Sequence, residues 1–268
     1  MTTFVRIYLL LLPALIGSGL VYGQNKRLPG LELAPGDTTA AILPLVKIFK
    51  APTANSRLIG QASEGQMFIV KQKTDVSAEF DGITQFWYEV AFGKEMNQSG
   101  FVFGPWLASG FAQTPDGTRF LLRVIESGND NTDAKQVDIK VVGPDGPLVT
   151  FLRQIPIAPD DSLVVRRRDS LDFLGYTNLI VFDFVGANCP SRHRELGVLW
   201  NGTEAMQMPM PAAAEGVQSP CFSYQYVLPG DPGGEPGFLK IRVQKTATQM
   251  EWVKFRLKEG FGFLEVRG

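Results

Sequence analysis

The chain has 268 residues, enough for about two domains of ordinary size. Its hydrophobic fraction of 44% supports well-buried cores, and its charged fraction of 20% excludes a generally disordered chain. Because the formal net charge is only -1, the chain as a whole gives no electrostatic reason to expect a nucleic-acid partner or an anionic membrane surface.

Residues 1–23 have the pattern of a signal peptide. The basic Arg6 precedes an almost wholly apolar stretch, 7–16, and residues 21–23 suit a signal peptidase. The apolar stretch is shorter than the ~20 residues that a membrane span needs. We therefore expect cleavage near Gly23/Gln24, a mature chain without a membrane span, and an exported protein that is periplasmic or secreted.

Residues 24–41 contain two prolines and two glycines in a polar context, so we expect a linker there. From Ile42 to Leu107 the pattern changes to short apolar or alternating runs, such as Leu45–Phe49 and Met67–Val70, separated by turn residues. No helical period occurs in this region. These features predict a small antiparallel β-barrel over residues 42–108.

The order of motifs in this region resembles that of a bacterial SH3 (SH3b) domain. The matching stretches are Val46–Thr53, Leu58–Gly60, Glu64–Gln66, Phe86–Val90 and Gly100–Leu107. Where the family has an Arg, a small residue and a Pro after its opening strand, this chain has Phe49, Ala51 and Pro52. The resemblance implies a non-enzymatic domain that binds a cell-wall peptide or glycan, or a protein partner.

Aromatic side chains are the candidate ligand contacts of this domain, because such rings line grooves that recognise peptides. The candidates are Phe49, Phe86, Tyr88, Phe103 and Trp106. The alternative is that these rings, with Trp87, are only the core and edge packing of a small barrel. The sequence leaves both interpretations open.

Residues 111–268 have the pattern of a succession of strands, and we identify no family for this region. Alternating runs such as 136–142 and 148–152 flank an Asp145-Gly146 turn, which is a strong hairpin signal. The spacing of the strands predicts an antiparallel β-sandwich or barrel. The basic triplet 166–168, followed by Asp169 and Asp172, is expected to be a solvated turn.

Cys189 and Cys221 are the only cysteines, and in an exported chain an even pair favours a disulfide. Two alternatives involve His193. The first is a metal site with both cysteines, which lacks a fourth ligand. The second is a catalytic Cys–His pair, because residues 193–202 resemble the strand that carries the His in NlpC/P60 cell-wall peptidases. In those enzymes the nucleophile opens a helix well upstream of the His, whereas Cys189 lies four residues before His193 and precedes a proline.

Asp183, Glu195 and Glu204 are acids of this domain, but the sequence establishes no paired-carboxylate geometry for them. We therefore expect no catalytic residues, no metal and no cofactor. The sequence predicts an all-β, exported, non-enzymatic binding protein of the cell envelope, with an SH3-like barrel followed by a β-rich domain. The alternative is an envelope hydrolase with its catalytic groups in the C-terminal domain.

Overall fold

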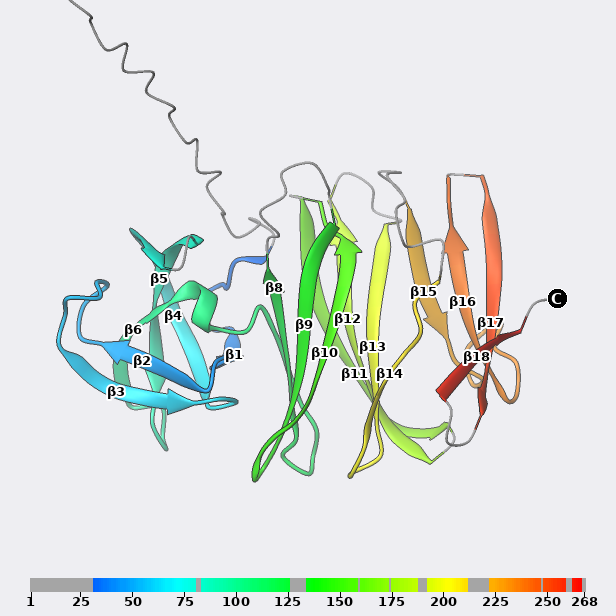
Figure 1. The fold of residues 1–268 in the computed structure, drawn as a ribbon, viewed down its shortest axis with the longest axis horizontal. Helices are drawn as coiled ribbons and strands as arrows, with labels where there is room; N and C mark the ends of the chain where they lie inside the picture. The colour runs from blue at the N-terminus through cyan, green and yellow to red at the C-terminus, as the bar shows by residue number, and fades with distance from the viewer. Residues whose placement is uncertain are drawn as a thin grey trace, which may run out of the picture.

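The computed structural model describes residues 31–80, 83–125, 134–158, 160–173, 175–187, 192–211, 222–246, 248–258 and 262–266. Over these residues the chain is all-β, which confirms the predicted fold class. Three sheets follow one another along the long axis of the molecule (Figure 1). None of the described residues form a helix long and apolar enough to cross a membrane. The expected signal peptide, 1–23, lies outside the described residues.

The N-terminal unit is one antiparallel sheet of six strands that curls around its own core. In the order of pairing, its strands are β1 (Thr38–Ala40), β4 (Met67–Phe80), β5 (Ile83–Phe92), β6 (Gln98–Phe103), β2 (Leu45–Phe49) and β3 (Leu58–Ser63). Buried and exposed residues alternate along β2 and at the start of β4, as expected where one face of a strand packs inward. The core contains Val46, Ile48, Phe68, Val90 and Val102.

The segment expected to be a linker is part of the folded structure wherever it is described. β1 pairs with β4, and both Leu31 and Leu33 are buried. Leu33 packs into the core of the N-terminal unit, whereas Leu31 packs into the core of the following sheets. The apolar residues of this short segment thus enter two cores, which outweighs its content of proline and glycine.

The C-terminal part begins with a four-stranded sheet in the order β10 (Gly146–Pro156), β9 (Ala134–Gly143), β8 (Arg119–Ile125), β7 (Gly110–Gln113). An eight-stranded sheet follows. Its strands are β11 (Asp161–Phe173), β12 (Tyr176–Gly186), β13 (His193–Trp200), β15 (Ser223–Val227), β16 (Phe238–Gln244), β17 (Met250–Lys258) and β18 (Gly262–Val266), with β14 (Ala205–Gln207) beside β13. Among the described strands every pairing is antiparallel except one parallel pair, Arg194 with Tyr224, which joins β13 to β15.

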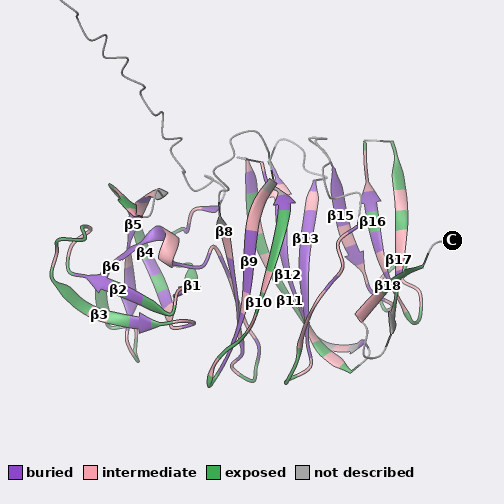
Figure 2. Cartoon of the chain, in the orientation of Figure 1, coloured by how far each residue is buried: buried purple, intermediate pink, exposed green. Residues whose placement is uncertain are grey.

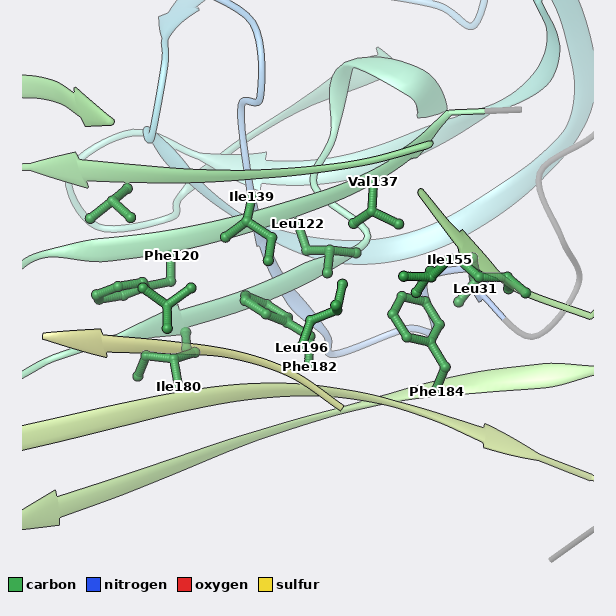
Figure 3. Close-up of a cluster of buried hydrophobic side chains, with 14 of the residues drawn as sticks. Leu31, Phe120, Leu122, Val137, Ile139, Ile155, Ile180, Phe182, Phe184 and Leu196 are labelled. Carbon is green, nitrogen blue, oxygen red and sulfur yellow. The ribbon is translucent and has the colours of Figure 1, made fainter. Parts of the chain in front are cut away.

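β12 and β13 are buried on both faces, and so they divide two hydrophobic cores (Figure 2). One face packs on the four-stranded sheet, where Phe120 and Ile139 meet Phe182 and Leu196 (Figure 3). The opposite face, which carries Leu199, packs against residues of β15, β16 and β17. The eight-stranded sheet therefore curls back on itself and encloses the second core.

The N-terminal unit and the four-stranded sheet share an interface of apolar and ionic contacts. Ala40, Ile42, Ala108, Leu121 and Val142 form one buried cluster across it. At its edge the Lys140 ammonium forms an ion pair with Glu64 and donates to the Ile42 carbonyl oxygen at 2.9 Å. Arg119 donates to the carbonyl oxygen of Gly65 at 3.1 Å.

Candidate functional sites

A cluster of aromatic rings lies on the face of the N-terminal sheet opposite its core. The rings come from four strands and from the short 3-10 turn η2 (Gly104–Trp106) that follows β6. Phe49 and Trp87 meet edge to face with centroids 5.5 Å apart, and Phe80 lies 4.6 Å from Phe103 and 5.3 Å from Trp106. Ring pairs at these separations attract each other beyond the area they bury.

The cluster has a buried base and a partly exposed rim. Phe49, Trp87 and Phe103 are buried at the base, while Phe80 and Trp106 are partly exposed, as is the neighbouring Phe101. The Trp87 indole N–H is buried and has no hydrogen-bond partner among the described residues. Buried donors are almost always paired, so this unpaired donor beneath partly exposed rings requires an explanation.

The five aromatic residues predicted to form a groove divide between the two faces of the sheet. Phe49, Phe103 and Trp106 meet in the aromatic cluster. Tyr88 is 1% exposed and packs into the core on the other face, so its ring presents no surface to a ligand. Phe86 lies on the Tyr88 side, because neighbours two apart share a face, and the Lys73 ammonium lies 4.1 Å from its ring centroid. A single groove containing all five rings is therefore not formed.

A second candidate site lies in the curled eight-stranded sheet and consists of charged groups. Asp183 on β12 lies directly opposite Glu195 on β13. The Arg166 guanidinium, from β11, donates to Asp183 Oδ2 at 3.0 Å and forms an ion pair with Glu195. His193 Nδ1 lies 2.8 Å from the same Asp183 oxygen. These four residues are called the acid–base cluster below.

The carboxylates of this cluster are removed from water, whereas its basic groups reach the surface. The side chain of Asp183 is 1% exposed and that of Glu195 7%, against 26% for His193 and 44% for Arg166. Asp183 Oδ1 is buried without a hydrogen-bond partner among the described residues. Burial raises the pKa of Glu195, although the backbone N–H of Tyr226, 2.6 Å from its Oε2, and Arg166 oppose that shift.

The contact with Asp183 orients the His193 ring, as the carboxylate does in an Asp–His pair. A proton on Nδ1 directed at Asp183 fixes the tautomer and leaves Nε2 as the basic atom. Nε2 could then accept a proton from a bound water or alcohol. Within the described ranges no side-chain hydroxyl is hydrogen-bonded to the His193 ring, so the cluster contains a base without an established nucleophile.

The sequence interpretation missed this cluster because it assigned Arg166 wrongly. Residues 166–168 are not a solvated turn but part of β11, where they pair with Val181, Ile180 and Leu179. One signal was available, since Asp183 is a lone acid in the apolar run 179–185. A buried acid normally requires a charged partner.

Neither a metal nor a disulfide can be assigned from the described residues. No group of three His, Cys, Asp or Glu side chains within them is arranged to hold a metal ion. In the acid–base cluster Arg166 occupies the position between the two carboxylates. Cys189 and Cys221 both lie outside the described residues, so the predicted disulfide stays a prediction. Glu204 is exposed and apart from this cluster.

Comparison with known proteins leaves the family open. No family model matches the chain, and neither a curated protein nor a solved structure matches it. Function must therefore be argued from the two clusters themselves.

Proposed function

We propose that the chain is an exported, non-enzymatic binding protein of the bacterial cell envelope. Its N-terminal unit, which resembles an SH3b domain in sequence, is the binding module, and its ligand is a cell-wall peptide or glycan or a protein partner. The C-terminal sheets support this module through the shared apolar interface.

The observation that carries this proposal is the partly exposed rim of the aromatic cluster. Phe80, Phe101 and Trp106 come from three separate segments yet gather over the buried rings of Phe49 and Trp87. A small barrel needs only one core, and the N-terminal sheet already has one on its other face. Rigid aromatic rings at a surface offer a large contact area at little entropic cost, and they are frequent binding hot spots.

The rim also suggests the chemistry of the ligand. The base of the cluster is formed by the rings of Phe49, Trp87 and Phe103, so the complementary surface is apolar or is the face of a sugar ring. The unpaired Trp87 N–H costs about 1–3 kcal/mol if it stays buried and unsatisfied. A ligand carbonyl or hydroxyl oxygen, or a water that it brings, would relieve that cost when it reached the indole.

Cosedimentation with purified peptidoglycan tests the proposal. Wild-type protein should pellet with the polymer, and Trp106→Ala should bind about 5- to 100-fold more weakly, the range that corresponds to ~1–3 kcal/mol for a hot-spot aromatic. Trp252→Ala removes an exposed tryptophan from the far end of the chain and serves as the matched control. Equal binding by all three proteins would contradict the assignment of the site to the rim.

A second function, hydrolysis in the envelope, is favoured by one observation, the Asp183–His193 contact beside Glu195. If the acid–base cluster is catalytic, wild-type protein should release soluble fragments from peptidoglycan and His193→Ala should release none. The rim variant Trp106→Ala should then still cleave, though with weaker binding. Absence of any release by the wild type would leave the binding function alone.

A further inference from the structure

The outer face of the last four strands concentrates positive charge. Counting by the pairing register, the side chains of Lys240, Arg242, Lys254 and Arg256 all point away from the second core, on the side opposite Leu239, Ile241 and Phe255. These strands, β15 to β18, form the end of the molecule farthest from the N-terminal unit (Figure 1). This surface is called the cationic face.

Few acidic side chains face these cations, although Lys240 donates to the Gly233 carbonyl oxygen and Arg242 to the Gln225 side chain. Lys240 lies directly opposite Lys254, a like-charge pairing that destabilises an antiparallel sheet. None of the outward positions described on β15, β16, β17 and β18 carries an Asp or Glu. One acid from a neighbouring turn, Glu235, forms an ion pair with Lys254 at 2.7 Å. Four of the 26 Lys and Arg residues of a chain with a net charge of -1 thus lie together on this surface.

Large apolar side chains are exposed on the same face. Trp252 is 43% exposed, Met250 56%, Leu264 48% and Val266 40%. The register places them among the cations, since Trp252 pairs with Arg242, Leu264 with Arg256 and Val266 with Lys254. Figure 2 shows exposed and partly exposed segments along β17.

We propose that the cationic face docks on the surface of an anionic phospholipid bilayer. Tryptophan and aliphatic side chains enter the boundary between headgroups and acyl chains, while Lys and Arg reach the lipid phosphates with their long stems lying along apolar surface. This inference does not rest on the proposed function, because it uses a different sheet and none of the aromatic cluster.

The details of the face favour a lipid surface over other polyanions. The Lys240 ammonium lies 4.7 Å from the Trp252 ring centroid, and Arg256 lies 5.0 Å from that of Phe238. A cation therefore lies over each ring and competes with a sugar or a base for stacking on it. Leu264 and Val266 have no role against a hydrated polymer, and a second copy of the chain would bring like charges together.

Vesicle cosedimentation of the chain from Gln24 onward tests the proposal. Vesicles of phosphatidylcholine containing phosphatidylglycerol should bind the protein, pure phosphatidylcholine vesicles should not, and added salt should release it. The double variant R242E/R256E should bind at least about tenfold more weakly, since each basic residue adds affinity for an anionic surface. The control K47E/R57E makes the same charge change at two exposed positions of the N-terminal unit and should bind as the wild type does.

The single variant Trp252→Ser separates lipid insertion from simple charge attraction, and its melting curve checks that it folds. It should lose binding to anionic vesicles while keeping any weak binding to soluble polyglutamate. Loss of binding in the control as in R242E/R256E, no binding by the wild type, or unchanged vesicle binding by Trp252→Ser would each overturn the proposal.

Discussion

Asp183 and Glu195 lie directly opposite each other on β12 and β13, both buried, with the Arg166 guanidinium in contact with both. Two carboxylates so placed repel each other, and removal from water disfavours their charged forms. Arg166 therefore does more than an ordinary surface arginine, because it compensates two buried charges from a third strand.

Removing Arg166 should destabilise the fold. Arg166→Met leaves Asp183 and Glu195 buried without their cation. Because the Arg166 side chain is itself 44% exposed, the cost should lie below the ~3–5 kcal/mol of breaking a fully buried ion pair and above the ~0–1 kcal/mol of a surface pair. Arg167→Met is the matched control, because Arg167 contacts only exposed groups in the described residues, the Asp169 carboxylate and the Gln113 carbonyl oxygen, and an exposed ion pair is worth about 0–1 kcal/mol. Urea unfolding of both variants measures the difference, and equal losses would show that Arg166 does not hold the cluster.

The raised pKa of Glu195 predicts a dependence of stability on pH. A carboxyl group whose pKa is higher in the folded state binds its proton more tightly there, so folding is favoured at low pH. As the pH rises from the ordinary value of 4.5 through the raised folded value, the wild type should lose stability relative to Glu195→Gln. Denaturation midpoints from pH 4 to pH 8 test this. Glu204→Gln, at an exposed position, should parallel the wild type, and a parallel curve for Glu195→Gln would contradict the prediction.

Tyr88 distinguishes a core aromatic from a ligand contact. Because its ring is 1% exposed, Tyr88→Ala should lower the free energy of unfolding by about 3–5 kcal/mol, as for other large-to-small aromatic changes. Leu45→Ala, at a side chain that is 53% exposed, should change it by about 0.5 kcal/mol or less. A mild effect of Tyr88→Ala on melting would mean that this ring is not part of the core.

The fold class could be predicted from the sequence because strand signals are local. The period-two alternation in 136–142 predicts a strand, and the structure has β9 there. The Asp145-Gly146 turn predicts a hairpin, and it joins β9 to β10. The role of 31–41 could not be predicted in this way. Its burial depends on cores built by residues far along the chain, whereas its prolines and glycines act locally.

The candidate sites were harder to predict for the same reason. Alternation places Phe86 and Tyr88 on one face and Trp87 on the other, but only the pairing of β5 with its neighbours decides which face packs inward. The acid–base cluster needs the register that sets Asp183 opposite Glu195. A slip of one residue would send either carboxylate to the other core, and no short motif specifies that register.

The disulfide between Cys189 and Cys221 stays a prediction, because both cysteines lie outside the described residues. Thiol counting on denatured, unreduced protein from an oxidising compartment should find no free thiol. Two titratable thiols per chain would contradict the pairing and revive the alternatives that involve His193.

The most direct test of the binding function is a calorimetric titration of the chain from Gln24 onward with soluble peptidoglycan fragments. The wild type and Trp252→Ala should bind with the same affinity. Trp106→Ala should bind about 5- to 100-fold more weakly at a temperature where its melting curve shows it to be folded, since Trp106 lies on the partly exposed rim and also packs against other rings of the cluster. Binding by Trp106→Ala as tight as that of the wild type would contradict the assignment of ligand recognition to the aromatic cluster.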